Sequence, residues 1–203
     1  MSQPLTDRNT GGRACLAERV ELAAAARGER WAFESLVRAH TSRMYRVALR
    51  IVGDPLEAQD VVQDAWIAVW RGLPGYRGEA SAATWLHRVV TNAALDRLRA
   101  RKATVTLEQF EEWREPVDPA PGPETSALRR DEATQLRRVL GALGPSHRVV
   151  VVLREFEGLS YQELAEVLEI TTAAVRSRLH RGRAALLAAF ADHGVSRSGS
   201  APR

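Results

Sequence analysis

Apolar side chains recur every three or four residues along two blocks of the chain, which is the spacing of amphipathic helices. In the first block this spacing predicts one helix over 33–51 and a second around 62–69, with a Gly-Asp-Pro turn at 53–55 between them. A loop containing glycine and proline at 71–81 precedes a third helix over 82–101. No segment of this block has the alternating pattern that would predict a strand.

The second block opens with a helix predicted around 126–142, which the Gly-Pro pair at 144–145 ends. The next segment, HRVVVVLREF, is compatible with a buried strand or a buried helix, because a run of valines fits either. Its isolation from any other strand favours the helix. Two further helices are expected over 160–168 and 172–190, so the predicted fold class is all-α.

The segment between the blocks, VTLEQFEEWREPVDPAPGPETS, has the composition of a flexible linker, with four prolines and six acidic residues against one arginine. Both ends of the chain are low in apolar residues, which predicts disordered tails. The expected organisation is a tail with a short helix over 1–28, a first domain over 29–103, an acidic linker over 104–127, a second domain over 128–192 and a tail over 193–203.

Composition sets wide limits on the kind of protein. With 203 residues, of which 45% are apolar, the chain can bury one medium core or two small ones. Lys102 is the only lysine among the 29 basic residues. An arginine-favouring genome explains this excess as well as phosphate binding does, so only the positions of the arginines can indicate a partner.

Several classes of protein are excluded or disfavoured by simple absences in the sequence. Cys15 is the only cysteine, which rules out an internal disulfide and a cysteine-based zinc site within one chain. The first residues lack the apolar core of a signal peptide, and no run approaches the roughly 18 apolar residues needed to span a bilayer. The sequence also contains no phosphate loop, no plausible metal cluster and no pairing of a nucleophile with a base. We therefore expect a soluble, cytoplasmic protein that inserts into no membrane, catalyses no reaction and binds no cofactor.

The helices predicted over 160–168 and 172–190 have the spacing of a helix-turn-helix. Ser160 and Glu163 predict a capping box at the start of the first helix. Ala165, Glu169 and Val175 occupy the three positions that define the motif: a small residue, a turn residue and a residue that fills the core between the helices. A threonine at 171 or 172 can cap the second helix.

The second helix of this motif carries four arginines in eight positions, and no acidic residue occurs from 170 to 191. A helical wheel places Val175, Leu179, Gly182 and Leu186 on one inward face. The opposite face has small residues rimmed by guanidinium groups, which fits a major groove where arginine can contact guanine or a phosphate. The alternatives are a basic helix that only solubilises the domain and a membrane-surface helix. The latter is weaker because the inward face has no aromatic residue before Phe190. We therefore expect this helix to bind DNA.

Three motifs in order make the prediction more specific: EAQDVVQDAWIAVW, YRGEASAATWLHRVVTNAALDRLR and GLSYQELAEVLEITTAAVRSRLHRGRAAL. Together they resemble the sigma-70 family of bacterial transcription initiation factors, and most closely its small two-domain branch, the extracytoplasmic-function (ECF) sigma factors. The resemblance covers about 30–102 and 126–190. It implies two small helical domains, of the sigma region 2 and region 4 types.

The resemblance also implies surfaces for core RNA polymerase. Asp60, Gln63 and Asp64 lie at positions i, i+3 and i+4 of a predicted helix, and the family uses the matching helix to dock on the coiled-coil clamp of the largest polymerase subunit. These residues would then bind through carboxylate and amide hydrogen bonds. From the residues alone, a solvated acidic edge near a helix N-terminus explains them equally well. The second domain would contact the flap region of the polymerase.

The resemblance also implies that the first domain reads and opens the −10 promoter element. The third helix of this domain interleaves rings with arginines, an arrangement that suits unpaired bases. Asn92 matches the family position that reads a flipped-out base. Trp85 is also compatible with a core position, and the arginines at the end of this helix with a simple preference for the helix dipole. The residues assigned to the −10 element and to melting are Tyr76, Arg77, Trp85, Arg88, Asn92, Asp96, Arg97 and Arg99.

The second domain would read the −35 promoter element through the helix-turn-helix. Family members commonly carry glycine where this chain has Glu169, and a non-glycine residue at positive φ costs roughly 1 kcal/mol, so a mildly strained turn is expected. The usual Pro-x-Gly-Thr is replaced at 171–174, which leaves the promoter sequence open. The residues assigned to the −35 element are Thr171, Thr172, Arg176, Ser177, His180, Arg181 and Arg183.

Two other classes of protein remain as alternatives. A stand-alone helix-turn-helix regulator would bind a palindromic duplex as a dimer without polymerase, and its first block would serve for dimerisation or sensing. A helical interaction module without a DNA role is disfavoured by the one-sided arginine helix. The family resemblance further implies an anti-sigma factor as a partner.

Overall fold

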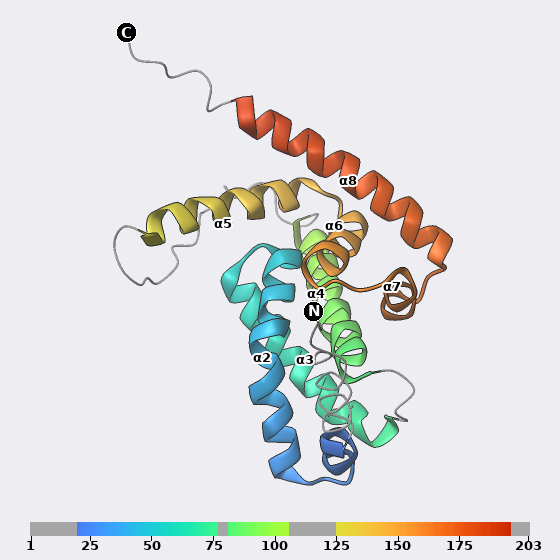
Figure 1. Cartoon of the computed structure of the whole chain (residues 1–203). Coiled ribbons are helices and arrows are strands. Elements are labelled where there is room, and N and C mark those ends of the chain that lie inside the picture. The colour runs from blue at the N-terminus through green and yellow to red at the C-terminus, as the bar shows by residue number, and fades with distance from the viewer. Residues whose placement is uncertain (1–19, 77–80, 106–124, 196–203) are drawn as a thin grey trace, which may run out of the picture.

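The computed structural model describes residues 20–76, 81–105 and 125–195 (Figure 1). Within these ranges the chain is helical and no strand occurs, which confirms the predicted all-α fold of two helical domains. The tails and most of the acidic linker predicted over 104–127 lie outside the described residues. The elements are α2 (Arg30–Val52), α3 (Pro55–Gly72), η1 (Leu73–Gly75), α4 (Ala82–Val105), α5 (Thr125–Ala142), α6 (Pro145–Val151), η2 (Val152–Phe156), α7 (Tyr161–Leu168) and α8 (Thr172–Val195).

In the first domain α2, α3 and α4 pack against one another, and local signals in the sequence set the sharp turn between the first two. Gly53 ends α2 in the left-handed conformation, with φ of 85°. The carboxylate of Asp54 then accepts hydrogen bonds from the backbone N–H groups of Leu56 (2.8 Å) and Glu57 (2.9 Å). Pro55 occupies the first position of α3, where its missing N–H costs nothing. The predicted helix boundary at 53–55 is therefore confirmed.

The valine run of the second domain is helical. This agrees with the sequence interpretation, which favoured a helix because no other strand was predicted nearby. The run forms α6 and continues without a break into η2, a π-helical turn. The valines at 149–152 are buried, because α8 crosses over α6 and η2 lies against α2. A helix buried on several sides is hydrophobic on most of its faces, which explains why this segment has no amphipathic period.

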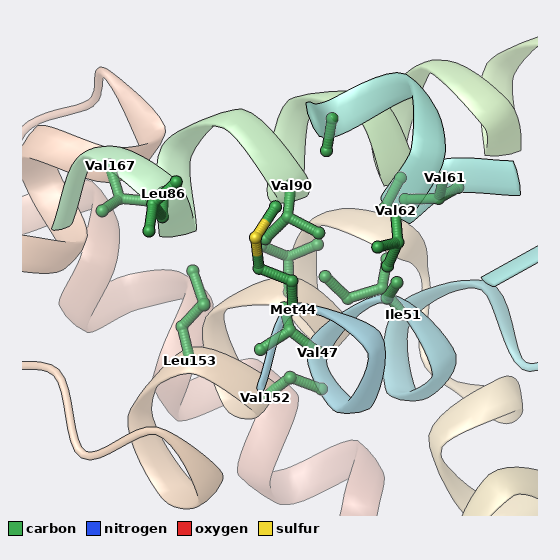
Figure 2. Packing of buried hydrophobic residues seen from close by; sticks show 14 of the residues in the cluster. Met44, Val47, Ile51, Val61, Val62, Leu86, Val90, Val152, Leu153 and Val167 are labelled. Carbon is green, nitrogen blue, oxygen red and sulfur yellow. The ribbon is translucent and has the colours of Figure 1, made fainter. Parts of the chain in front are cut away.

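A continuous apolar core joins the two domains (Figure 2). Met44 and Val47 of α2 face Val152 of η2, and Leu86 of α4 lies beside Val167 of α7. All five side chains are buried. Composition allowed either one medium core or two small ones, and the described residues form one.

A buried carboxylate lies where the two domains meet. Glu157 follows η2, and its side chain is only 5% exposed. Its Oε2 atom accepts a hydrogen bond from Nε of Arg43 in α2 at 2.7 Å, and Nη1 of Arg50 lies 3.5 Å from Oε1. Nε2 of His87 in α4 lies 3.6 Å from Oε2. The first domain thus supplies three basic side chains to one carboxylate of the second.

The burial of His87 predicts a loss of stability in mild acid. Burial, followed by the charge of Arg43 and a smaller effect of His40, lowers the pKa of His87 below its ordinary value of 6.5, although Glu157 opposes the shift. Below about pH 6.5 the unfolded chain therefore binds a proton that the folded protein does not. The free energy of unfolding should fall by up to about 1.4 kcal/mol for each pH unit below 6.5, until the pKa of the folded state is reached.

Urea unfolding between pH 7.5 and 5.5 measures this loss. The His87→Asn variant should show a much flatter dependence over the same range, because asparagine carries no titrating proton. An equally steep dependence in that variant would assign the effect to other groups.

Gly182 allows α8 to cross close to α6. A Cβ atom at this position would lie 2.8 Å from Cγ2 of Val151 and 3.3 Å from the backbone oxygen of His147. Gly182→Ala should therefore destabilise the protein by about 1–3 kcal/mol through overpacking. Gly141→Ala, near the end of α5, is the matched control, because nothing lies within 4 Å of the added methyl group. The control should gain up to about 1 kcal/mol from helix propensity. Urea unfolding that gave both variants the same stability would contradict the close crossing.

Candidate nucleic-acid interface

The helix-turn-helix forms as its capping signals predict. Ser160 Oγ accepts a hydrogen bond from the backbone N–H of Glu163 at 3.2 Å, and the backbone N–H of Ser160 donates to Oε2 of Glu163 at 2.7 Å. At the start of α8, Oγ1 of Thr171 accepts from the backbone N–H of Ala174 at 3.1 Å. Thr171, and not Thr172, therefore caps the N-terminus of α8.

The turn of the motif carries the strain expected from its sequence. Glu169 ends α7 in the left-handed conformation, with φ of 53° and ψ of 43°. It is the only non-glycine residue with positive φ in the described part of the chain. Its backbone N–H still donates to the carbonyl oxygen of Ala165, so the turn keeps its helix-ending hydrogen bond.

The two faces of α8 divide as the helical wheel predicts. Val175, Leu179 and Gly182 are buried against the rest of the domain, and Leu186 is half-buried. The residues assigned to DNA on the other face reach solvent together and form a basic surface that extends from the turn. They are Arg176, Ser177, His180 and Arg181, all exposed.

Two further residues assigned to the −35 element are less open. Thr172 is half-buried at the start of α8. Arg183 is exposed, but its Nε and Nη2 atoms donate to Oε1 of Glu155 at 3.0 and 2.7 Å. These hydrogen bonds raise the pKa of Arg183 above its ordinary value. A DNA contact by Arg183 would therefore compete with a partner inside its own domain.

The residues assigned to the −10 element differ in how far they reach solvent. Asn92 and Asp96 are exposed one turn apart, so both are accessible to a base. Trp85 is half-buried, and its ring lies 5.0 Å from that of Tyr76, at 40°. Trp85 thus packs against Tyr76 and is still partly accessible to solvent. Arg77 lies outside the described residues.

The arginines of α4 already have protein partners. Arg97 of α4 reaches α3, where its Nε lies 3.4 Å from Glu57 and its Nη2 lies 3.5 Å from Oδ2 of Asp60. Arg99 pairs with Asp96 on the same helix. The pairs of Arg97 with Asp60 and of Arg99 with Asp96 are largely exposed and are worth little free energy, so nucleic acid can displace them.

The three residues assigned to polymerase lie on the outer face of α3. Asp60, Gln63 and Asp64 are all exposed. Gln63 borders a shallow hollow of about 630 Å³ that is also lined by Tyr45 and Arg46 of α2. Asp60 differs from the other two because Arg97 pairs with it, so Gln63 and Asp64 are the more available for a partner.

The same face of α3 exposes two large apolar side chains that the sequence interpretation did not assign. Ile67 is 42% exposed and Trp70 48% exposed, one and two turns beyond Gln63. Trp70 packs edge-on against Phe33 of α2, with ring centroids 4.8 Å apart. Neither residue belongs to the buried apolar stripe of α3. An apolar residue outside that stripe is the feature of the sequence from which this exposed surface could have been predicted. A polar edge beside exposed apolar groups is typical of a protein-binding surface.

Among the described residues, no group of three or more histidine, cysteine, aspartate or glutamate side chains is arranged to hold a metal ion. Over the same residues, no helix has the length and apolar character needed to cross a bilayer.

Comparison with known families identifies both halves of the chain. Residues 36–104 match the family description sigma-70 region 2, and residues 133–186 match sigma-70, region 4. The matches fall on the two helical domains, in the order of the motifs in the sequence.

Two curated relatives agree with these matches. The chain is 36% identical to the ECF RNA polymerase sigma factor SigE of Mycolicibacterium smegmatis, over 83% of this chain but only 65% of that relative. It is 35% identical to the RNA polymerase sigma-H factor of Pseudomonas aeruginosa, over 84% of this chain and 90% of that protein.

Two solved structures share the arrangement of helices. CnrH in complex with the cytosolic domain of CnrY is 28% identical and has a TM-score of 0.65, covering 91% of this chain and 99% of CnrH. The sigma factor RpoE in complex with the anti-sigma factor NepR from Bartonella quintana has a TM-score of 0.64, covering 78% of this chain and 96% of the other. At 20% identity, this second likeness concerns the fold alone.

Proposed function

The chain belongs to the sigma-70 family, in its ECF branch, and we propose on this premise that it directs core RNA polymerase to promoters with −35 and −10 elements and helps to open them. Family membership favours this function over that of a stand-alone helix-turn-helix regulator. The observation that carries the proposal is the presence, in one chain, of a region 2 match and a region 4 match whose α8 exposes a basic face.

We assign the −35 element to the second domain, over 128–192. Arg176 and Arg181 flank Ser177 and His180 on the exposed face of α8, so guanidinium groups can reach guanine edges and phosphates from both sides of the helix. The backbone at Thr171 and Thr172 begins that helix, where the positive end of the helix dipole favours a phosphate. Arg183 contributes only after it exchanges Glu155 for DNA.

We assign the −10 element to the first domain, over 29–103. Asn92 and Asp96 are the candidates for reading an extruded base, since both are exposed on adjacent turns of α4. Trp85 lies about two turns before Asn92 on the same helix, and its half-buried ring packs against Tyr76 at an angle of 40°. The remaining members of the assigned set would hold the backbone of the opened strand: Arg77, Arg88, Arg97 and Arg99.

Partners follow from the same assignment. Core polymerase would bind the outer face of α3 with its clamp and the second domain with its flap region. An anti-sigma factor is a further proposed partner, supported by the presence of such a factor in the RpoE structure. The protein would act in the cytoplasm, where polymerase works, without a cofactor and without catalysing a reaction of its own.

A binding measurement tests the proposed polymerase surface. Gln63→Ala/Asp64→Ala should weaken binding of the full-length protein to purified core polymerase by about tenfold to a hundredfold, because two buried polar contacts are lost at once. Both side chains are exposed in the free protein, so the free energy of unfolding should change by no more than about 0.5 kcal/mol.

Asn92→Ala/Asp96→Ala is the matched control for this experiment, which contains no DNA. It also removes one amide and one carboxylate, from exposed positions of α4 that are assigned to DNA and not to polymerase. The control should bind core polymerase nearly as the wild type does. Equal affinity of all three proteins for polymerase would place the binding surface elsewhere.

A further inference from the structure

A pocket lies where α4 meets α6, α7 and α8, apart from the face of α3 assigned to polymerase. α4 packs against α6 and α7, and α8 packs against both of these helices, so all four contribute to its wall (Figure 1). Its volume is about 390 Å³, within the range of about 300–1,000 Å³ that is typical of small-molecule sites. The function proposed above leaves this pocket without a ligand.

The apolar part of the wall is aliphatic. Leu95 and Leu98 lie one turn apart on α4, and both are half-buried. Val149 of α6 is buried, and Leu168 at the end of α7 is half-buried. No aromatic side chain lines the pocket in the described part of the chain. A flat ring would therefore find no stacking partner, whereas an aliphatic chain can lie against all four side chains.

The polar part of the wall is mostly basic. Arg99 and Lys102 line the pocket from α4, and Arg178 lines it from α8, whereas no acidic side chain among the described residues does so. Arg99 pairs with Asp96, but Arg178 has neither a hydrogen bond nor an ion pair with any residue that the structure describes. Arg178 is also half-buried, and a guanidinium partly withdrawn from water without a counter-ion favours an anion as its partner.

We propose that this pocket binds the anion of a monomeric, medium-length aliphatic acid, with its chain against the leucines and its carboxylate at Arg178. A small inorganic anion would leave the aliphatic wall in contact with water, and an uncharged chain would leave Arg178 without a counter-ion. Binding is a property of the free protein and needs neither polymerase nor promoter. The site therefore stands or falls independently of the proposed sigma function.

Lys102 is the only lysine in the chain and lines the pocket, so its reactivity reports whether the pocket is occupied. The N-hydroxysuccinimide ester of acetic acid acetylates Lys102 and the amino terminus of the full-length protein, and mass spectrometry separates the two products. Laurate, kept below its micelle concentration, should slow acetylation of Lys102 about threefold or more at saturation, because it covers the amine. The amino terminus should react at an unchanged rate and serves as the internal control.

The dependence on chain length distinguishes a buried chain from a surface ion pair. Each buried methylene group contributes about fourfold in affinity. Octanoate is four methylene groups shorter than laurate, so half-maximal protection of Lys102 should need an octanoate concentration about tenfold to two-hundredfold higher. Dodecylammonium, which has a similar chain but the opposite charge, should not protect Lys102. Equal half-maximal concentrations of octanoate and laurate, or protection by dodecylammonium, would overturn the proposed ligand.

Arg178→Gln tests the position of the carboxylate, and should raise the laurate concentration for half-maximal protection of Lys102 about tenfold. Arg176→Gln is the matched control: Arg176 is exposed on the same helix but does not line the pocket, so this variant should bind laurate as the wild type does. If Arg178→Gln does not fold, Arg99→Gln replaces a largely exposed side chain of the same wall and should raise that concentration several-fold. Wild-type protection in whichever of the two variants fold would overturn the site.

Vesicles of phosphatidylglycerol distinguish a monomeric acid from a membrane surface. They present anionic headgroups above their acyl chains, and should leave the acetylation rate of Lys102 unchanged, because a bilayer cannot enter a recess between four helices. Equal protection of Lys102 by vesicles in the wild type and in Arg178→Gln would assign the effect to the basic surface of the protein and would overturn the pocket.

Discussion

Replacing Arg148 with methionine is expected to lower the free energy of unfolding by about 3–5 kcal/mol. The arginine is 9% exposed in α6, and its guanidinium donates to three backbone carbonyl oxygens: Ile51 at 2.6 Å, Gly141 at 2.8 Å and Leu143 at 3.0 Å. These carbonyls lie at or just past the ends of α2 and α5, where helices leave acceptors without partners. Methionine can fill the volume of the aliphatic part of the arginine side chain, but it donates no hydrogen bond. Each buried carbonyl oxygen left without a donor costs about 1–3 kcal/mol.

The expected loss is that of the three hydrogen bonds, reduced by the desolvation penalty of the guanidinium, which methionine does not carry. Burial, followed by the charge of Arg101, lowers the pKa of Arg148 below its ordinary value. Urea unfolding compared with Arg176→Met provides the control, since Arg176 is exposed on α8 and its loss should change stability by no more than about 0.5 kcal/mol. Equal stability of the two variants would mean that the three carbonyls have other donors.

Arg176→Ala/Arg181→Ala should reduce transcription from promoters that depend on a −35 element by about a hundredfold or more. Each arginine forked onto a base contributes about 1–3 kcal/mol of discrimination, and loss of two such contacts multiplies the effects. Both side chains are exposed on the face of α8 that we assign to DNA, so the folded structure should be retained. The yield of specific transcripts at fixed concentrations of core polymerase and sigma factor measures the loss.

Arg27→Ala/Arg30→Ala removes the same charge at and just before the start of the first domain and serves as the control. Arg27 and Arg30 are exposed and pair locally with Glu29 and Glu34, away from α8. The control should keep most of its activity. An equal loss in both double variants would assign the effect to net charge, rather than to contacts made by the recognition helix.

The parts of the fold that could be predicted are those set by short segments of sequence. Gly53 and Asp54 set the turn between α2 and α3 because a left-handed glycine and a capping carboxylate act within a few residues. The capping box of Ser160 and the buried and exposed faces of α8 follow from equally local spacing. For the same reason the strained conformation of Glu169 could be expected from the sequence.

The contact between the domains could not be predicted in this way. Arg43 and Glu157 are 114 positions apart, and Arg148 and Ile51 are 97 apart. The sequence presents Glu157 as one of several acidic residues before a basic helix, whereas the structure buries it. These contacts depend on how the two domains pack against each other. The spacing of apolar residues within either domain therefore cannot predict them.

The sequence predicted where the candidate polymerase-binding residues lie on their helix, but not which other side chains of the protein contact them. Sequence spacing correctly placed Asp60, Gln63 and Asp64 together on an exposed helix face. It did not reveal that Arg97 engages Asp60, or that Arg88 binds the opposite domain, because both contacts depend on how separate helices pack. Those contacts make Gln63 and Asp64 the sharper choice for mutation.

Multi-round transcription with purified core polymerase on a library of genomic fragments tests the central claim most directly. Wild-type protein should produce new, specific start sites that share −35 and −10 sequences, and Gln63→Ala/Asp64→Ala should lose them. If no new start sites appear, and the protein alone binds a palindromic duplex tightly as a dimer, the chain acts as a stand-alone regulator and does not direct polymerase to promoters.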